Sequence, residues 1–311
     1  MSTEYILPLA DPRATIARVG GKGASLARLA RAGLPVPNGF HITTDAYRHF
    51  VAENDVRASL RHAPTIGDVF ARAPLSPTLG DEIARAYLAL GNSALEIPVA
   101  VRSSATAEDL AELSFAGQQE SFLNVRGAAA VQAAVKRCWA SLWTPRAREY
   151  RAQHAVAEDA LALAVVVQEL VEADAAGVMF TADPVSGQRD CIVINAAWGL
   201  GDAVVSGQVT PDTLSVDKAS GRVIEYDVAD KTAMTVCIEG GIATRATPVH
   251  LRRVAVLSDA HIAELARLGA QIERLYALPM DIEWVLARGR FAIVQARPIT
   301  TLPNEKTQGR I

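Results

Sequence analysis

The sequence predicts a mixed α+β protein with two lobes. Helical patterns dominate the first half of the chain, whereas β-branched runs and a hairpin pattern dominate the second half. The length of 311 residues corresponds to two domains of roughly 100–200 residues each. A polar, Ala/Asp-rich stretch over Gln168–Ala176 marks the boundary. We therefore expect an N-terminal lobe over 1–172, a C-terminal lobe over 173–302 and a tail over 303–311.

The first half is predicted to be mainly helical. A glycine-rich turn over Gly20–Ser25 leads into a short helix that stops at Gly33. Thr43 or Thr44 is a suitable cap for the next helix, which continues through Phe50. Residues 53–80 contain proline breakers and show the weakest pattern. Further patterns predict helices over 81–90, 128–143 and 145–154, and a strand over 98–103.

The second half is predicted to consist mainly of strands. The β-branched run Leu163–Val171 indicates a buried strand. Apolar residues recur at helical spacing over Ser258–Leu275, which predicts one amphipathic helix. Ile282–Leu286 and Phe291–Ala296 form a predicted hairpin. Further strand candidates are 177–181, 191–195, 213–216 and 223–226.

Composition excludes several classes of protein. The net charge is −3 with no basic block, which argues against nucleic-acid binding. No apolar run reaches the roughly 18–20 residues that a membrane span needs, and the N-terminus shows no secretory signal pattern. The three cysteines are widely spaced and include no CxxC pair, which is typical of a reducing compartment. We therefore expect a cytoplasmic protein that contacts neither membrane nor nucleic acid.

Two motifs in the first half suit a phosphate group. In Gly20–Ser25, glycines let backbone N–H groups approach an anion, and Lys22 adds a positive charge. The alternative is a tight turn with an exposed lysine. Arg102 stands at a predicted strand end before small hydroxyl residues, and guanidinium groups bind phosphate in a bidentate way. Here the alternative is an ordinary helix cap at Thr106.

The C-terminal hairpin carries four polar side chains at alternate positions. Asp281 and Glu283 share one strand face, and so do Gln295 and Arg297. With Arg288–Arg290 as a three-residue loop, Glu283 opposes Gln295 and Asp281 opposes Arg297; a two- or four-residue loop would break this grouping. An acid beside an amide oxygen suits Mg²⁺ with phosphate oxygens, and an arginine suits the same phosphates. The alternative is a solvent-facing stripe with an Asp–Arg pair.

Two further segments suit nucleotide binding. The Ser114–Gln119 loop mixes small and amide residues and suits a cover over a nucleotide, although such loops are common. Gln168–Val171 ends the buried strand just before the boundary, where backbone groups suit an adenine edge. The alternative for this segment is a plain core strand leaving the sheet.

Taken together and in order, the motifs resemble the ATP-binding domain of the phosphoenolpyruvate synthase and pyruvate phosphate dikinase family, which also includes rifampicin phosphotransferases. The resemblance spans residues 18 to 300 and implies an ATP-grasp architecture, with Mg-ATP between two α+β lobes. The matching stretches are VGGKGASLARL, GLPVPNGFHITTDAY, VAVRSSATAEDLAELSFAGQQESFLNV, VVVQELVEADAAGVMFTADPVSG, AAWGLGDAVVSGQVTPD and DIEWVLARGRFAIVQARPIT.

The resemblance implies a role for each matching residue. Lys22 and Arg102 would hold the ATP phosphates, and Arg297 would bind near the transferred group. Glu283 and Gln295 would ligate magnesium. The adenine-facing segment would comprise Gln168, Glu169, Leu170 and Val171, with Glu169 and Val171 as backbone partners, and the phosphate cover would include Ser114, Gly117, Gln118 and Gln119.

The sequence departs from the family pattern at two positions. Asn195 stands where a glutamate often precedes the GLG segment, and Asp202 replaces a glutamate after it. The resemblance implies that a contact to the ribose or the metal through either acid is altered in this sequence.

A larger departure is the absence of the family's phosphorylatable histidine. Its context resembles GGxTSH, and none of the six histidines stands in that context: His41, His49, His62, His154, His250 and His261. The resemblance therefore implies only the first half-reaction on these residues. It favours the ATP-binding subunit of a split aryl phosphate synthase that acts on phenol or cresol through a separate histidine-bearing subunit. The alternatives are an excised domain of a single-chain synthase or antibiotic phosphotransferase, and a non-catalytic nucleotide-binding module.

Overall fold

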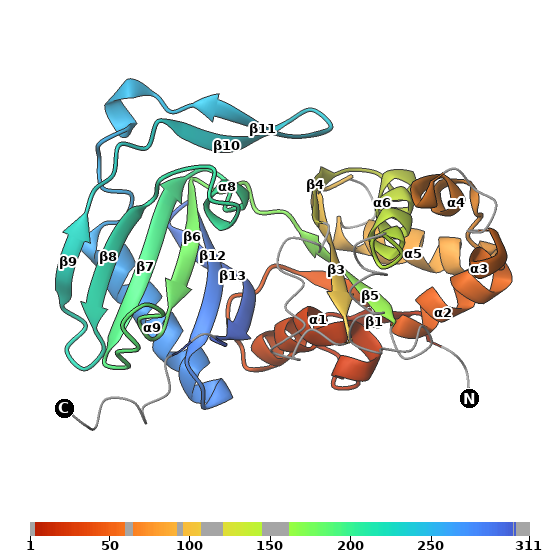
Figure 1. The fold of residues 1–311 in the computed structure, drawn as a ribbon, viewed down its shortest axis with the longest axis horizontal. Helices are drawn as coiled ribbons and strands as arrows, with labels where there is room; N and C mark the ends of the chain where they lie inside the picture. Colours follow the sequence, from red (N-terminus) through yellow and green to blue (C-terminus); the bar gives the residue numbers. More distant parts are fainter. Residues whose placement is uncertain are drawn as a thin grey trace. The chain divides into compact units, whose positions relative to one another are not determined.

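A computed structural model describes residues 4–59, 65–91, 96–106, 121–144, 162–300 and 302. These residues form two compact units, drawn in Figure 1. The first unit extends to Leu170 without Ala32–Val36, and the second begins at Val171 and includes Ala32–Val36. Both units combine helices with antiparallel sheets, which confirms the predicted α+β class.

The first unit is built on a five-stranded antiparallel sheet in the order β1-β2-β5-β3-β4. Valines alternate between its two faces because successive side chains of a strand point to opposite sides. Val165 and Val167 of β5 face the main hydrophobic core, and Val166 faces the other side. The strands are β1 (Ile6–Pro8), β2 (Gly39–Ile42), β3 (Val99–Ala105), β4 (Ser121–Val125) and β5 (Leu163–Glu169).

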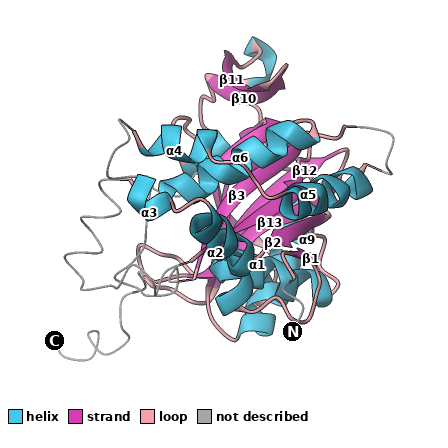
Figure 2. Cartoon of the chain, turned by 90° about the vertical axis from the view of Figure 1, so that its right-hand side faces the viewer, coloured by secondary structure: helices cyan, strands magenta, loops and turns pink. Residues whose placement is uncertain are grey.

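Helices cover both faces of this sheet. The core side carries Phe50, Tyr87 and Trp139 from three helices, and these side chains share one hydrophobic cluster with the valines. Figure 2 draws the helices on this side of the sheet. Helix α1 (Ile16–Arg31) lies on the other face, where a Cβ on Gly23 would stand 3.2 Å from Nδ1 of His41. The core-side helices are α2 (Thr44–Glu53), α3 (Val56–Ser59), α4 (Ile66–Arg72), α5 (Pro77–Leu90) and α6 (Ala128–Ser141).

Several predictions for the first unit need correction. The described parts of 53–80 are not irregular, because they contain α3, α4 and the first turn of α5. Pro77 was interpreted as a breaker, but it stands in the first turn of α5 behind the Ser76 cap, where proline needs no N–H partner. The strands β1, β2 and β4 were not predicted. The predicted helix over 145–154 lies outside the described residues.

The second unit is built on a six-stranded antiparallel sheet in the order β13-β12-β6-β7-β8-β9. Helix α9 (Asp259–Tyr276) packs on one face, where a Cβ on Gly269 would stand 2.8 Å from the Met179 sulfur. Ser258 caps this helix by accepting a hydrogen bond from the His261 N–H. The strands are β6 (Ala175–Phe180), β7 (Cys191–Trp198), β8 (Asp212–Asp217), β9 (Val223–Asp227), β12 (Met280–Ala287) and β13 (Arg290–Pro298).

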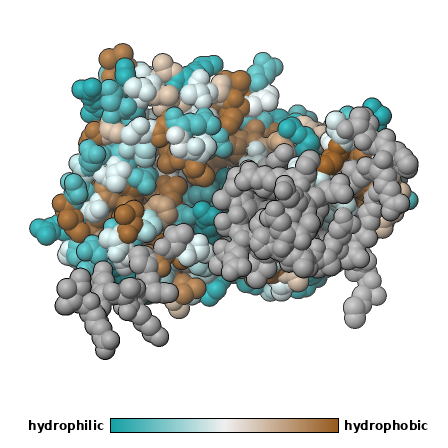
Figure 3. Space-filling model, in the orientation of Figure 1, coloured by the Kyte–Doolittle hydropathy of each residue, from teal (hydrophilic) through white to brown (hydrophobic). Residues whose placement is uncertain are grey.

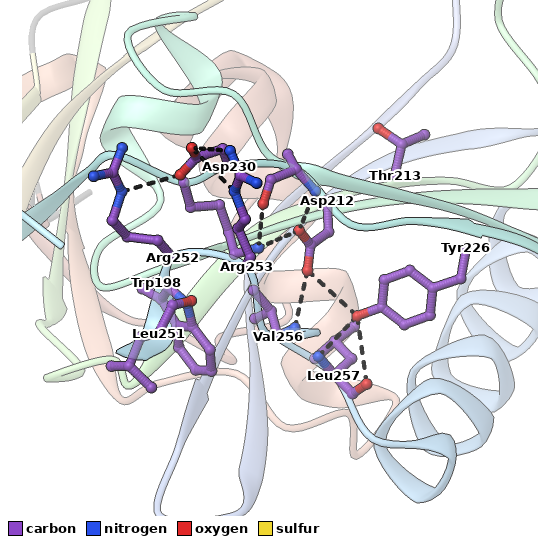
Figure 4. A network of polar contacts seen from close by, with 12 residues as sticks. Trp198, Asp212, Thr213, Tyr226, Asp230, Leu251, Arg252, Arg253, Val256 and Leu257 are labelled. Atoms are coloured by element: carbon purple, nitrogen blue, oxygen red, sulfur yellow. Dashed lines mark hydrogen bonds and ion pairs between the residues drawn. The ribbon is translucent and has the colours of Figure 1, made fainter. Parts of the chain in front are cut away.

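A separate hairpin, β10 (Ala233–Ile238) with β11 (Gly241–Ala246), was not predicted. A buried ion pair holds its base. The Asp212 carboxylate accepts hydrogen bonds from the Lys231 ammonium and from the Ala229 and Val256 N–H groups, and both charged side chains are fully buried. Figure 4 shows the hydrogen bond between Asp212 and Val256. The Thr235 carbonyl of this hairpin accepts a hydrogen bond from the Leu200 N–H, which links the hairpin to the segment after β7.

Two short elements complete the second unit, α8 (Asp202–Val205) and the 3₁₀ turn η1 (Val249–Leu251). On the face shown in Figure 3, hydrophobic and hydrophilic residues are interspersed over this unit. Among the described residues, no helix has the length and apolar character needed to cross a membrane.

Candidate functional site

The β12–β13 hairpin brings together the polar residues that the sequence paired. Glu283 lies opposite Gln295, and Asp281 lies opposite Arg297. The predicted three-residue loop is wrong, because Ala287 pairs with Arg290 and leaves a two-residue turn. A register shift beyond Glu283 compensates for the shorter turn. A two-residue loop alone would have separated the four polar residues onto different faces. The β-bulge restores their grouping on one face.

These side chains lie on the sheet face opposite α9. Ile282, between the two acids, is fully buried and belongs to the α9 side of the sheet together with its partner Met179. On the other side, Gln295 is only 8% exposed, whereas the Arg297 side chain is 63% exposed. The pair of potential oxygen ligands is thus held close to the sheet, and the guanidinium reaches toward solvent.

The Asp281 carboxyl and the Arg297 guanidinium form an ion pair. Nε of Arg297 donates to Oδ2 of Asp281 at 2.8 Å. Burial raises the pKa of Asp281 above its ordinary value, and the nearby arginine opposes this shift. The Asp–Arg pair named as the alternative interpretation is therefore present, and it fixes one edge of the guanidinium beside the Glu283–Gln295 pair.

The polar row continues across the sheet to Asn195. Glu283 pairs with Val178, Val178 pairs with Asn195, and Asn195 pairs with Thr213, so their side chains share one face. Nδ2 of Asn195 donates to the Thr213 hydroxyl at 2.9 Å. Asn195, one of the two departures from the family pattern, thus lies on the same sheet face as Glu283. Thr213 was not singled out from the sequence, because its position became visible only through the strand register.

Asp202 lies on a different element. It is exposed in the first turn of α8, after the GLG segment, and not on the strands that carry Glu283 and Gln295.

In the first unit, the glycine-rich segment contacts β3 directly. The segment is not a turn that precedes a helix: α1 begins at Ile16 and is interrupted at Gly20, whose φ is 70°. A Cβ on Gly20 would stand 2.3 Å from the Ser104 carbonyl oxygen, so only glycine fits this contact. Lys22 follows the interruption, and Arg102 lies two residues before Ser104 on the same strand face. The two predicted phosphate motifs are therefore neighbours.

The two serines that follow Arg102 are buried inside the protein. Ser103 and Ser104 are 1% and 0% exposed. Ser103 lies opposite Val165, on the core side, whereas the Ser104 hydroxyl bonds to backbone groups of α1. Arg102 itself is half-buried, and its role in phosphate binding stays a prediction.

The end of β5 is pinned by its neighbours. Glu169 N–H donates to the Asn38 carbonyl at 2.8 Å, and Leu170 N–H donates to the Pro98 carbonyl at 2.9 Å. The Gln168 side chain is buried and donates to the Pro37 carbonyl at 3.3 Å. Burial raises the pKa of Glu169. The segment thus emerges from the sheet in a fixed conformation, with Val171 next along the chain.

The predicted cover loop, Ser114, Gly117, Gln118 and Gln119, lies outside the described residues.

Comparison with known proteins identifies the family to which these motifs belong. Residues 16–310 match the family described as pyruvate phosphate dikinase, AMP/ATP-binding domain. The chain belongs to this family. The match covers almost all of the sequence and confirms the resemblance drawn from the motifs. It also makes the chain an ATP-binding domain of the phosphoenolpyruvate synthase and pyruvate phosphate dikinase family.

Curated relatives of this dikinase-family domain carry two kinds of name. A probable phosphoenolpyruvate synthase of Methanocaldococcus jannaschii is 45% identical over 93% of the chain and 26% of its own length. The phosphoenolpyruvate synthase of Pyrococcus furiosus is 40% identical over 93% of the chain and 43% of its own length. A rifampicin phosphotransferase of Streptomyces sviceus is 42% identical over 97% of the chain and 36% of its own length. The chain therefore spans about a quarter to less than half of the length of these relatives.

Proposed function

We propose that this domain binds Mg-ATP and carries out the ATP-dependent half-reaction of a dikinase, phosphorylating a histidine outside residues 1–311. The proposal rests on the Glu283–Gln295 pair, which lies beside the Asp281–Arg297 ion pair on the sheet face that α9 does not cover. The chain that carries these residues belongs to an ATP-binding family. Oxygen ligands next to an arginine suit a metal-bound polyphosphate.

The proposal assigns a role to each unit, as the ATP-grasp architecture implies. In the first unit, Lys22 and Arg102 hold the phosphates, supported by the contact between the glycine-rich segment and β3. The Glu169 carbonyl and the Val171 N–H are proposed to form hydrogen bonds with the adenine edge. The Glu169 and Leu170 N–H groups are not available for this, because they already donate hydrogen bonds within the first unit. Gln168 holds this segment in place. Asp202 and the Ser114–Gln119 loop remain proposed nucleotide contacts.

The residues of the second unit fit magnesium. Glu283 and Gln295 offer a carboxylate and an amide oxygen from directly opposed positions. Among the described residues, no group of three or more acidic, histidine or cysteine side chains could hold a metal by itself. Mg²⁺ commonly takes one or two protein carboxylates and completes its shell with phosphate oxygens and water. We therefore propose that Glu283 and Gln295 hold the metal together with ATP.

When bound, magnesium would offset the negative charge of the phosphate oxygens. A histidine nitrogen attacks the β-phosphorus, the bond from this phosphorus to the α–β bridging oxygen breaks, and AMP leaves. Water then releases the γ-phosphate as inorganic phosphate, and phosphohistidine remains for the acceptor. Arg297 stabilises charge on the transferred group, so Arg297→Ala should reduce turnover far more than ATP affinity.

The histidine and the acceptor site are proposed to lie on another domain or on a separate subunit. Candidate acceptors are pyruvate and a phenolic compound such as phenol or cresol, because the residues that would select the acceptor are not in this domain. A non-catalytic nucleotide-binding module is the second candidate, and Asn195 in the polar row favours it.

The position of a radioactive label in ATP tests the half-reaction. The domain is incubated with its histidine-bearing partner domain and with ATP labelled at either the β- or the γ-phosphate. We expect acid-labile protein label from β-labelled ATP only, labelled inorganic phosphate from γ-labelled ATP, and AMP in equal amount. Stable label derived from the γ-phosphate with ADP as product would contradict the dikinase reaction. Absence of any turnover with intact Mg-ATP binding would favour the non-catalytic module.

A further inference from the structure

Helix α1 contains a break that a side chain from another element fills. In a continuous α-helix, the Gly23 N–H would donate to the Val19 carbonyl four residues earlier. Here Gly20 has φ 70° and ψ 177°, and the Ser104 hydroxyl stands between the two groups. It donates to the Val19 carbonyl at 2.7 Å and accepts from the Gly23 N–H at 3.1 Å. The Ser104 hydroxyl thus makes two hydrogen bonds in place of the single helical hydrogen bond that is missing.

Insertion of a side chain into the helical ladder is a known cause of sharp kinks. Ser104 is fully buried, and the glycine at the break lets β3 approach α1 closely enough for the contact. The break matters because Lys22 lies between Gly20 and Gly23. The direction of the Lys22 backbone therefore depends on the hydroxyl of Ser104, and Ser104 is held on the same strand face as Arg102.

We infer that Ser104 is a positioning residue that sets Lys22 against Arg102 for phosphate binding. It is not placed to contact the nucleotide, because its side chain is fully buried and its hydroxyl hydrogen is already donated to the Val19 carbonyl. This inference rests on the proposed role of Lys22 in Mg-ATP binding. Its neighbour Ser103 provides a matched control: it is equally buried, lies on the opposite face, and has a hydroxyl without a hydrogen-bond partner in the described structure.

Calorimetric titration with Mg-ATP tests the inference. Ser104→Ala should raise the Kd about tenfold, because Lys22 is no longer held in its binding direction. Ser103→Ala should leave the Kd within about twofold. Ser104→Cys, with a weak donor and acceptor, should give an intermediate Kd and provides the test if the alanine variant does not fold. Wild-type affinity in Ser104→Ala or Ser104→Cys would overturn the inference.

A double-mutant cycle separates positioning from general destabilisation. If Ser104 acts through Lys22, then Lys22→Ala with Ser104→Ala should bind Mg-ATP as Lys22→Ala alone does, within about twofold. A purely structural role predicts that the two losses multiply, and that result would overturn the inference.

Hydrogen exchange provides a test that needs no nucleotide. The Gly23 amide should exchange faster in Ser104→Ala than in Ser103→Ala, since only the former loses its acceptor. Equal exchange would contradict the inference. If the wild-type protein does not bind Mg-ATP, the proposed function fails, whereas the exchange rates still decide whether Ser104 holds the break.

Discussion

The two units stabilise their functional segments with different kinds of buried polar group. The first unit uses neutral groups beneath the glycine-rich segment: the Ser104 hydroxyl and the His41 ring, which bonds to the Leu9 carbonyl at 3.0 Å. The second unit uses full charges, with Asp212 and Lys231 buried together at the base of the β10–β11 hairpin. Both arrangements fix backbone segments that are distant in sequence.

The two arrangements differ in how strongly each depends on its partners. A buried hydroxyl that loses a bond leaves a neutral group unsatisfied, which costs about 1–3 kcal/mol. A buried charge that loses its partner is far more expensive, about 3–5 kcal/mol. The first unit should therefore tolerate local change with moderate loss, whereas the second unit should fail when either charge is removed alone.

The largest expected effect comes from Lys231→Met. The variant leaves the Asp212 carboxylate buried without its counter-charge, so the free energy of unfolding should fall by about 3–5 kcal/mol in urea denaturation. Adding Asp212→Asn should recover part of the loss, because an amide oxygen still accepts the Ala229 and Val256 N–H groups.

Lys218→Met is the matched control. Lys218 pairs with Glu273 at 2.8 Å, but both side chains are partly exposed, so the loss should stay within about 1 kcal/mol. Equal losses for the two lysine variants would show that burial of the charge is not what distinguishes the units.

The second-largest expected effect is a pH dependence of stability that arises from His41 in the first unit. Burial lowers the pKa of His41 to about 4 from its ordinary 6.5. Between these values the unfolded chain binds more protons than the folded chain, so stability rises with pH through this window. The difference amounts to about 3 kcal/mol between the ends of the window.

His41→Gln keeps a donor for the Leu9 carbonyl and removes the titration. We expect its stability curve between pH 4 and 6.5 to be flatter than that of the wild type, as measured by urea denaturation at each pH. The exposed His250, changed to glutamine, should leave the slope unchanged. A slope that persists in His41→Gln would assign the pH dependence to other groups.

The smallest expected effect concerns the turn of the β12–β13 hairpin. Arg288 and Gly289 both have positive φ, of 51° and 71°, which is the pattern in which Asn-Gly is preferred. Arg288→Asn should raise the free energy of unfolding by about 0.5 kcal/mol, since asparagine tolerates this conformation better. Arg290→Asn, at a strand position, should bring no gain. A loss in Arg288→Asn would indicate that the arginine side chain stabilises the turn.

The sequence was sufficient where the apolar pattern is strong. Helix α9 follows apolar periodicity, strand β5 is a continuous β-branched run, and the Glu283–Gln295 pairing followed from spacing along two strands. That pairing was right although the loop length was wrong, because a bulge and a shorter turn offset each other. Bulges have no reliable signature in one sequence, so the agreement could not have been checked without the structure.

The features that escaped prediction depend on long-range polar contacts. The β10–β11 hairpin has half-exposed strands and is held by Asp212 and Lys231, whose pairing nothing local reveals. Ser104 belonged to a motif interpreted as a phosphate clamp, yet its hydroxyl is turned into α1, 81 residues away along the chain from Gly23. The family resemblance indicated the role of Lys22 and Arg102, but not how the fold sets one against the other.

The magnesium dependence of ATP binding tests the proposed metal site of the β12–β13 hairpin most directly. Calorimetric titrations compare ATP with and without Mg²⁺ for the wild type, for Glu283→Gln, and for Glu225→Gln as a control acid exposed on the same sheet face. We predict that Mg²⁺ strengthens ATP binding to the wild type and to Glu225→Gln, and that Glu283→Gln abolishes this gain. Magnesium-dependent binding that is unchanged in Glu283→Gln would contradict the assignment of the metal to the β12–β13 hairpin.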